Sequence, residues 1–292
     1  MDALKEYRTN PAIYSEDITL KQLYDDWSKS KYQYISKSTK ENYEGAWNKI
    51  SHYGKEPFKD LRTGNFQAVI DAYHANNASR STLSKVKILL GLLYNYAMQN
   101  DIVNKDYSDY VKLPKEEKIE KEIFSDIELQ ILEKNIALPW VDTILILIYT
   151  GLRISEFMNL TIFSVDFDNQ VITGGLKTDA GKNRVIPIHS KIYPHIAKWK
   201  NRNGNRLICN EKGKAIPVRA YREDMYYPTL DILGIRKINP HGCRHTTASL
   251  LKRAGADTLA IQRILGHADY AFTANVYTHT NIEELKKAMS LM

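Results

Sequence analysis

The spacing of apolar residues in the first third of the chain limits the folds that it can adopt. Between residues 20 and 94, apolar side chains recur every three to four positions in four successive stretches, which is the period of amphipathic helices. Ser38-Thr39-Lys40, Thr63 and Ser79-Arg80-Ser81 resemble helix caps at the starts of the second, third and fourth stretches. The connections are short and polar, so residues 19–100 are predicted to form a small all-helical bundle. The apolar positions are Leu20, Leu23, Tyr24 and Trp27; Tyr43, Trp47 and Ile50; Phe66, Val69, Ile70 and Tyr73; and Leu83, Val86, Leu90, Leu93 and Tyr94.

Residues 101–122 interrupt this periodicity. They are rich in charged residues and contain Pro114, a composition that favours a linker. Residues 1–18, which are polar and lack a clear period, are interpreted as an N-terminal tail or linker. A second domain, residues 123–292, is predicted to open with a helix, because Ser125-Asp126-Ile127-Glu128 has the pattern of a capping box.

The second domain is predicted to combine helices with a small sheet. Val141–Tyr149 is apolar nearly all round and should therefore form a buried helix. Between residues 164 and 188, β-branched residues flank glycine-rich turn signals, which predicts an antiparallel sheet with Lys177 near a hairpin tip. Further helices are expected, among them Val218–Leu233 and an amphipathic tail helix over residues 281–292. The predicted fold class is mainly α with a small antiparallel β-sheet, in a helical domain followed by a mixed α/β domain.

Charge and cysteine content narrow the classes of function. The net charge is +7 and the isoelectric point about 9.1, which favours a polyanionic partner. This positive charge is distributed unevenly along the chain, with a net charge of +1 over residues 1–120 and +6 over residues 121–292. Two cysteines, Cys209 and Cys243, are too few for a disulfide framework or a cysteine-rich zinc site. The N-terminus has no signal-peptide core and the apolar run at 144–149 is far short of a membrane span, so a reducing cytosol is the expected setting.

The residues able to carry chemistry are unremarkable when each is taken alone. An arginine such as Arg153 is more often a surface charge or an ion-pair partner, and Lys177 in a glycine-rich turn is more often solvated. His241 and His245 are one helical turn apart, which is also a metal-ligand spacing. A zinc peptidase would need a glutamate where Gly242 stands, and no third ligand can be named. We therefore predict no metal site.

Taken together, these segments resemble one family. In their order and intervals they are similar to the motifs of tyrosine recombinases, also called phage integrases, over the whole second domain. The first domain resembles the helical core-binding domain of that family, and residues 7–27 resemble the segment that precedes this domain in integrases of conjugative transposons. Cys243 stands where a leucine is more usual. The matching segments are Thr150-Gly151-Leu152-Arg153-Ile154-Ser155-Glu156, Lys177, His241-Gly242-Cys243-Arg244-His245-Thr246, Leu265-Gly266-His267 and Tyr277-Thr278-His279.

The resemblance implies that Tyr277 attacks a DNA phosphodiester and forms a 3′-phosphotyrosine with a free 5′-hydroxyl. The transition state gathers negative charge on the non-bridging oxygens. Arg153 and Arg244 suit this charge, since a guanidinium is planar, permanently charged and bidentate toward phosphate. A phenol is a poor nucleophile at neutral pH unless cations stabilise the phenolate and a neighbour takes its proton.

The resemblance also assigns the supporting groups. Lys177 is the expected general acid for the departing 5′-oxygen, and His241 the expected acceptor of the phenolic proton. His267 is expected to hydrogen-bond the phosphate, and Glu156 to orient or buffer the cationic cluster. The motif residues are cationic rather than clustered carboxylates, and no Walker loop occurs, so neither a metal, a nucleotide nor another cofactor is expected.

The expected partner is double-stranded DNA, bound mainly through its backbone. Lys85, Lys87, Lys115 and Lys118 are candidate phosphate contacts, although a solvated helix face explains the first two equally well. The resemblance implies two domains that close around the duplex, and a homotetramer that exchanges strands through a Holliday junction. Integration and excision of a mobile element, with accessory DNA-bending or excision factors, is the expected role, in the cytoplasm and not at a membrane.

Three alternatives remain open at this level. A type IB topoisomerase uses a similar catalytic set but relaxes supercoils as a monomer. A related protein that binds DNA without cutting is the other functional alternative. The third concerns the apolar side of the tail helix, residues 281–292, which either packs on its own domain or docks on a neighbouring protomer.

Overall fold

The structure is a computed structural model that describes residues 17–115, 122–174, 184–266 and 282–292. The chain divides into two compact units, Met1–Lys118 and Ile119–Met292, called below the helical unit and the mixed unit. Together they are mainly α-helical with one small antiparallel sheet in the part of the chain that is described, so the predicted fold class is confirmed.

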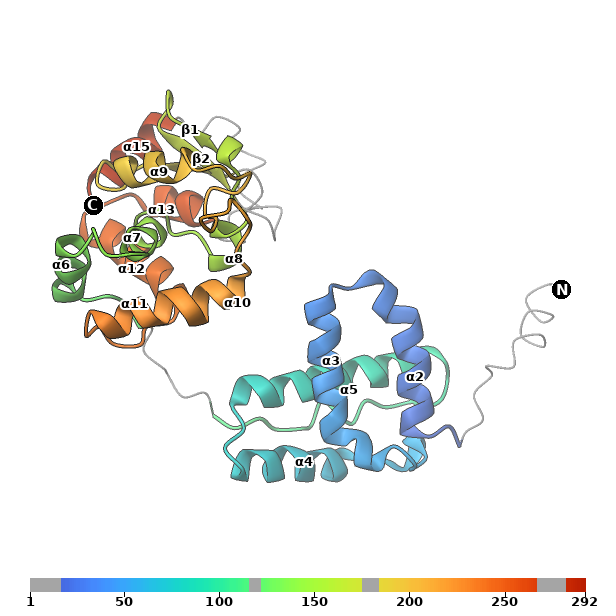
Figure 1. The fold of residues 1–292 in the computed structure, drawn as a ribbon. Helices are drawn as coiled ribbons and strands as arrows, with labels where there is room; N and C mark the ends of the chain where they lie inside the picture. The colour runs from blue at the N-terminus through green and yellow to red at the C-terminus, as the bar shows by residue number, and fades with distance from the viewer. Residues whose placement is uncertain (1–16, 116–121, 175–183, 267–281) are drawn as a thin grey trace. The chain divides into compact units, whose positions relative to one another are not determined.

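In its described residues, 17–115, the helical unit has four amphipathic helices. Their arrangement is drawn in Figure 1. Polar caps start three of them, because the side chains of Thr19, Ser36 and Ser79 accept hydrogen bonds from backbone N–H groups of the first turn. Their apolar faces meet in one core, in which the ring of Tyr24 stacks on Trp47 at a centroid distance of 4.1 Å. The helices are α2 (Leu20–Lys31), α3 (Lys37–Ile50), α4 (Thr63–Ala75) and α5 (Arg80–Gln99), with 3₁₀ turns at η1 (Tyr32–Tyr34), η2 (Ser51–Tyr53) and η3 (Phe58–Asp60).

Some details of this unit differ from the sequence prediction. Helix α3 starts earlier than predicted, capped by Ser36, and Tyr73 at the end of α4 is exposed rather than in the core. Residues 101–115, predicted to be linker, pack on the helical unit, since Ile102 and Val111 are buried in its core. Two apolar residues so far apart in the sequence give no periodic pattern. The prediction therefore rested on the charged composition of the segment, which is typical of a linker.

The mixed unit is organised around α7 (Val141–Thr150). All ten of its residues are buried, as its apolar sequence predicted. Helix α12 (Pro240–Arg253) packs directly on α7 (Figure 1). The other α-helices among the described residues of the unit are α6 (Asp126–Lys134), α8 (Ile154–Phe157), α9 (Tyr193–Lys200), α10 (Val218–Ala220), α11 (Tyr227–Ile232), α13 (Thr258–Leu265) and α15 (Ile282–Ser290), with a 3₁₀ turn at η4 (Ile162–Ser164).

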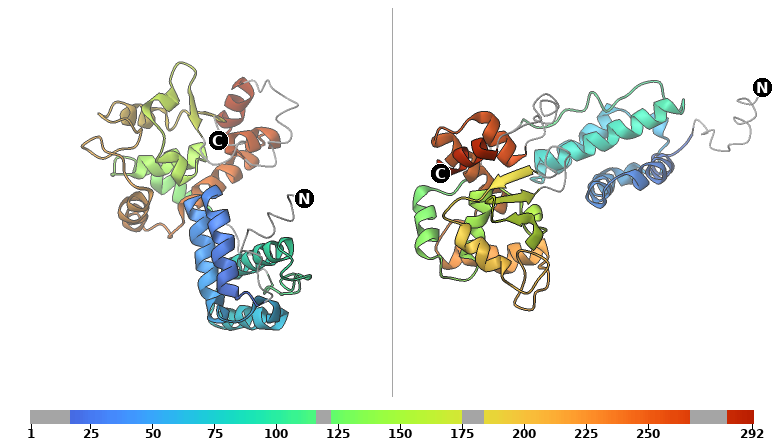
Figure 2. Two further views of the ribbon diagram at one scale, coloured as in Figure 1. Left: turned by 90° about the vertical axis from the view of Figure 1, so that its right-hand side faces the viewer. Right: turned by 90° about the horizontal axis from the view of Figure 1, so that it is seen from above.

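As far as the structure describes the chain, the predicted sheet has three short antiparallel strands, β1 (Val165–Asp166), β2 (Val171–Gly174) and β3 (Arg184–Pro187), in the order β1-β2-β3. In the pairing of β2 with β3, Ile172 lies opposite Ile186 and Gly174 lies opposite Arg184. Helices α13 and α15 both pack against β3, which can be followed in Figure 2.

The helix predicted over Val218–Leu233 is not a continuous α-helix. Its middle, η5 (Tyr221–Tyr226), is a π-helix, in which hydrogen bonds join residues five apart. This spacing turns both of its end residues toward the core, where the hydroxyl of Tyr221 lies 2.8 Å from that of Thr143. The apolar spacing alone does not distinguish a π-helix from an α-helix, so the sequence predicted one element.

The tail helix α15 packs on its own unit. Leu285, Ala288 and Met289 are buried in the core that also holds α7 and α12. Of the two alternatives for its apolar side, the structure therefore has the helix on its own domain. No helix within the described ranges has both the length and the apolar character that a membrane crossing requires.

Candidate active site

Arg153 stands at a tight junction between two helices. Helix α7 ends at Gly151, whose left-handed conformation (φ of 62°) turns the chain, and Arg153 then caps the short helix α8. Its backbone N–H donates to Oε2 of Glu156 over 2.9 Å and its Nη1 to Oε1 over 2.8 Å. The Glu156 side chain is only 1% exposed, whereas that of Arg153 is 30% exposed. The guanidinium is thus anchored at one edge and open at another.

A second arginine, Arg184 at the start of β3, binds the same carboxylate. Its Nη1 donates to Oε1 of Glu156 over 3.2 Å and its Nη2 to Oε2 over 2.8 Å. Burial by itself raises the pKa of Glu156, but the hydrogen bonds and charge of Arg184, with hydrogen bonds from Arg153, outweigh it and hold that pKa at about 2. Glu156 is therefore a carboxylate at every working pH.

The sequence analysis did not identify Arg184. The available signal was an arginine that opens an otherwise apolar strand, Arg184-Val185-Ile186-Pro187. A charged residue at such a position needs a partner when it is buried, but the partner becomes evident only from the sheet register and the fold.

Arg244, on the first turns of α12, is buried and held by two backbone carbonyls. Its Nη1 donates to the oxygen of Gly151 over 2.8 Å, and its Nη2 donates to the oxygen of Leu265. Burial, followed by repulsion from Arg153 and Arg184, lowers the pKa of Arg244 to about 9, while Glu156 opposes the change. The group therefore stays cationic at neutral pH. Arg153 and Arg184 share Glu156, and Arg244 binds the carbonyl two residues before Arg153, so the three guanidinium groups form one cluster.

The start of α12 is positioned by local sequence. The side chain of Asn239 caps the helix, accepting from the N–H groups of His241 (2.9 Å) and Gly242 (3.2 Å). His241 is exposed on this first turn, and its ring packs edge-on against that of His245 at 4.6 Å. Gly242 has no room for a side chain, because a Cβ there would lie 2.9 Å from the backbone oxygen of Glu122. Within the residues that the structure describes, no three His, Cys, Asp or Glu side chains gather as a metal site would need.

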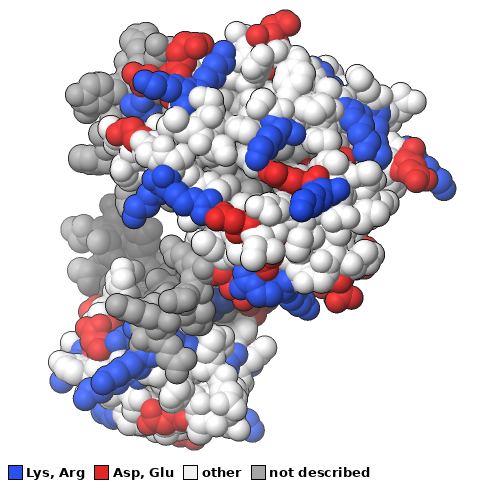
Figure 3. All heavy atoms as spheres, turned by 90° about the vertical axis from the view of Figure 1, so that its left-hand side faces the viewer, with Lys and Arg blue, Asp and Glu red and all other residues white. Residues whose placement is uncertain are grey.

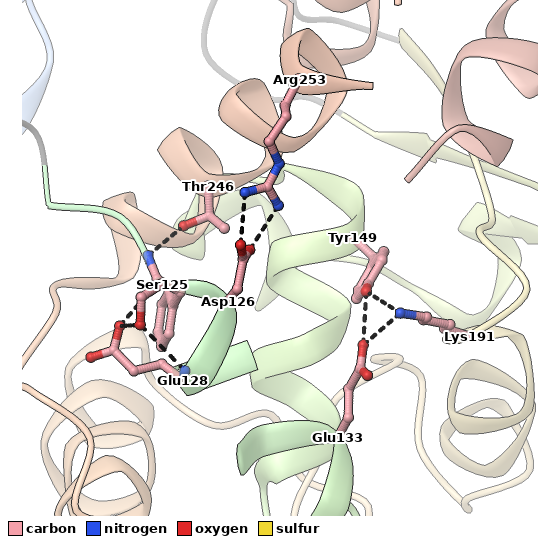
Figure 4. Close-up of polar contacts among 9 residues, drawn as sticks. Ser125, Asp126, Glu128, Glu133, Tyr149, Lys191, Thr246 and Arg253 are labelled. Carbon is pink, nitrogen blue, oxygen red and sulfur yellow. Dashed lines mark hydrogen bonds and ion pairs between the residues drawn. The ribbon is translucent and has the colours of Figure 1, made fainter. Parts of the chain in front are cut away.

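Two further contacts fix α12 against α6 (Figure 4). The backbone N–H of Phe124 donates to Oγ1 of Thr246 over 2.9 Å, and Arg253 forms two hydrogen bonds with Asp126. The middle and the C-terminal end of the helix that carries His241 and Arg244 are thereby attached to the body of the mixed unit.

A separate polar group on the same unit joins α6, α7 and the segment after β3 (Figure 4). Glu133 accepts from the hydroxyl of Tyr149 over 3.0 Å and from Nζ of Lys191 over 2.7 Å. These bonds link three elements, and we interpret them as structural. On the face drawn in Figure 3, basic and acidic side chains lie interspersed, which fits such surface pairs better than a single basic patch.

Three of the predicted catalytic residues, Lys177, His267 and Tyr277, lie outside the described residues. In the chain, Lys177 belongs to the segment that joins Gly174 to Arg184, the pair closing the described part of β2 and β3. His267 directly follows Gly266, at the end of the helix whose Leu265 carbonyl binds Arg244.

The four lysines predicted as DNA contacts differ in their surroundings. Lys85 and Lys115 are exposed, and Lys118 lies outside the described residues. Lys87 is instead engaged within the helical unit, where its Nζ donates to the backbone oxygens of Asp109 (3.2 Å) and Val111 (2.7 Å).

The comparisons with known proteins agree on one family. Residues 119–284, more than half of the chain, match the phage integrase family. Tyrosine recombinase XerC of Staphylococcus aureus strain JH9 is 28% identical over 276 residues, which span 87% of this chain and 89% of that protein. Two solved structures share the fold. The Tn1549 transposon integrase in complex with circular intermediate DNA has a TM-score of 0.74 at 23% identity, covering 94% of this chain and 99% of that one. A lambda integrase tetramer bound to a Holliday junction has a TM-score of 0.73 at 15% identity, covering 90% and 80%.

The family match, together with the shared fold, defines an enzyme that recombines DNA. The chain belongs to the phage integrase family of tyrosine recombinases. Its activity is therefore site-specific cleavage and rejoining of DNA.

Proposed function

We propose that this recombinase integrates and excises a mobile element, with Tyr277 as the nucleophile that forms a 3′-phosphotyrosine. The observation that carries the proposal is the arginine cluster, in which Arg153 and Arg244, far apart in the sequence, are held near one another by buried contacts. A phosphodiester repels nucleophiles, so two fixed cations beside it lower the barrier to attack.

The contacts of Arg244 support its role in particular. Two carbonyls already hold its guanidinium, so the group does not have to reorganise when negative charge develops on the phosphate. Arg153 supports the same charge from the open edge of its guanidinium, with Glu156 fixing the other edge. Removing either arginine is expected to slow cleavage roughly 10²–10³-fold, as for other preorganised charge stabilisers.

The proton transfers of the proposed cleavage balance as follows. The phenolic oxygen of Tyr277 attacks phosphorus as its proton passes to His241, and the bond from phosphorus to the 5′-oxygen breaks as Lys177 gives that oxygen a proton. His267 donates a hydrogen bond to the phosphate. The exposure of His241 at the start of α12 is compatible with its part. The phosphotyrosine keeps the energy of the original ester, so attack by a 5′-hydroxyl from another strand reseals DNA without a nucleotide cofactor.

We further propose that the enzyme acts as a homotetramer on two duplexes, through a Holliday junction. Support comes from the shared fold with a lambda integrase tetramer bound to such a junction and with the Tn1549 integrase bound to DNA. Exposed Lys85 and Lys115 are proposed backbone contacts, and accessory DNA-bending or excision factors are proposed to set the direction of the reaction.

Covalent trapping tests the proposal. A pool of duplexes with randomised cores, each nicked beside the core, releases a short fragment on cleavage and traps the enzyme on the DNA. The wild-type protein is expected to yield adducts that survive denaturing detergent, and Tyr277→Phe none. Tyr193→Phe, which changes another tyrosine of the mixed unit, is the matched control and should behave as wild type. Sequencing the trapped DNA gives the target site.

Two outcomes would contradict the proposal. Adducts formed equally by Tyr277→Phe would exclude this nucleophile, and an absence of adducts from the wild type across the whole pool would exclude the phosphotyrosine mechanism. A plasmid carrying two copies of the recovered site then separates strand exchange from relaxation of supercoils, the activity of a type IB topoisomerase.

A further inference from the structure

Arg184 has a geometry that stability alone does not explain. Its side chain is 3% exposed and forms a two-pronged ion pair with the buried Glu156. Its Nε–H has no hydrogen-bond partner among the described residues. A buried donor without a partner is destabilising, and a buried ion pair is often no more stable than apolar residues of similar volume. The retention of this pair therefore points to a role in the chemistry.

The charges around Glu156 suggest what that role is. The carboxylate accepts hydrogen bonds from both Arg153 and Arg184, so its single negative charge is shared between two cations. With Arg184 present, the cluster of Arg153, Arg184, Arg244 and Glu156 keeps two net positive charges. Without Arg184, Glu156 would neutralise Arg153, the other guanidinium that the described residues place on it, and one positive charge would remain for a phosphate.

We propose that Arg184 is a positioning residue for DNA cleavage, which neutralises Glu156 so that the charge of Arg153 stays available to the scissile phosphate. This inference rests on the proposed role of Arg153 at the phosphate. Glu156 then serves as a bridge between the two arginines, fixing the direction of Arg153 without cancelling its charge.

Because Arg184 lies on a strand, its contact with Glu156, and through Glu156 with Arg153, is held in a fixed position. Its backbone pairs with Gly174, and the next residues pair Val185 with Thr173 and Ile186 with Ile172. Residues held by a sheet position a neighbouring group more accurately than residues on a loop. Arg153 is thereby attached, through Glu156, to the sheet as well as to the junction after α7.

The test compares Arg184→Met with a matched control, Arg236→Met. Arg236 holds the largely buried Glu128 in a similar two-pronged pair, with bonds of 2.8 and 3.0 Å, but is not part of the arginine cluster. The substrate is the target duplex identified by covalent trapping. The single-turnover rate of adduct formation is expected to fall about 100-fold in Arg184→Met and to stay within about threefold of the wild-type rate in the control. Equal rates for the two variants would refute the inference.

A charge-rescue variant separates this role from a structural one. Adding Glu156→Gln to Arg184→Met removes the unbalanced carboxylate and restores two net positive charges. The double variant is expected to cleave about tenfold faster than Arg184→Met alone. If Arg184 only held the fold together, the second substitution would slow cleavage further or leave it unchanged, and either result would overturn the inference.

A measurement independent of cleavage keeps this inference distinct from the proposed function. The pKa of the Glu156 carboxyl, followed by ¹³C NMR, is expected to rise in Arg184→Met and not in Arg236→Met, because only the former removes its main partner. If that pKa does not move, the inference fails even where Tyr277 proves to be the nucleophile. A different combination would separate the two proposals the other way. If the pKa of Glu156 rises and the double variant is rescued, Arg184 keeps its proposed role. If Tyr277→Phe nevertheless still forms adducts, only the assignment of the nucleophile is wrong.

Discussion

At the scale of a single residue, Glu156 belongs to the proposed cleavage site and also contributes to stability. Its pKa lies at about 2 in the folded protein against an ordinary value of 4.5. A carboxyl whose pKa is lowered by folding stabilises the protein above the ordinary value, and this contribution is lost as the pH falls toward the folded value. At about 1.4 kcal/mol per pKa unit, the contribution is on the order of 3 kcal/mol. Because the side chain is almost fully buried, screening by solvent reduces it little.

We therefore expect Glu156→Gln to be less stable than wild type by about 3 kcal/mol at pH 7. The difference should shrink between about pH 4.5 and pH 2, where the carboxyl of the unfolded wild-type chain takes up a proton that the folded protein does not yet bind. Urea unfolding of both proteins at several pH values measures this. A difference that stays constant down to pH 2 would mean that the substitution acts through packing and not through charge.

The sequence could identify candidate-site residues that belong to a motif, but not a candidate that only the fold brings to them. Arg153, Glu156 and Arg244 were predicted, and the structure places them together. Arg184 was missed because its partner is defined by strand pairing. Lys87 was proposed to contact DNA, but the carbonyls that bind it belong to an irregular segment whose path no local pattern predicts.

At the scale of elements, the C-terminus of α7 is the point on which the site depends. Gly151 ends the helix with a positive φ of 62°, and its carbonyl accepts a hydrogen bond from Arg244. A Cβ added to Gly151 would lie 2.5 Å from Cδ2 of Leu265 and 3.2 Å from Thr247. The residue therefore serves both the turn and the close approach of α12 and α13.

Gly151→Ala is expected to lose stability and cleavage rate together. Gly234→Ala is a matched control, since Gly234 has a similar φ of 65° but nothing within 4 Å of an added Cβ. The control should lose about 1–2 kcal/mol, the strain of a left-handed backbone conformation. Gly151→Ala should lose about 1–3 kcal/mol more through overpacking and cleave at least about tenfold more slowly, because Arg244 loses its position. Thermal unfolding and the adduct assay measure both, and equal losses in the two variants would contradict the role assigned to Gly151.

Element prediction succeeded where periodicity and caps agreed. The Ser125 capping box and the apolar run of α7 both mark real helices, and β-branched residues marked the sheet. It failed at η5, where tertiary contacts of Tyr221 and Tyr226 accompany a π-helix inside a helical pattern. Which apolar surface the tail helix covers was also undetermined, because an amphipathic stripe gives no information about its partner.

At the scale of the whole molecule, charge is distributed unevenly between the two halves of the chain. Residues 121–292 carry a net +6 and residues 1–120 only +1. The DNA contacts proposed for the first half therefore rest on individual cations that face solvent and not on a general excess of positive charge. Lys85 and Lys87, two positions apart on α5, allow a test of this point. Lys85 is exposed and available to a phosphate, whereas Lys87 is bound to two carbonyls.

Lys85→Ala is expected to weaken DNA binding and to lower the slope of log affinity against log salt by about 1, the loss of one phosphate contact. Lys87→Ala should leave that slope unchanged and instead cost about 1 kcal/mol of stability, since the exposed carbonyl of Asp109 and the part-buried carbonyl of Val111 lose their donor. Anisotropy titrations of the full-length variants with a labelled duplex at several salt concentrations, together with thermal unfolding, distinguish the two. A lower slope for Lys87→Ala with wild-type stability would show that DNA draws this lysine away from its carbonyls. An unchanged slope for Lys85→Ala would remove that residue from the DNA interface.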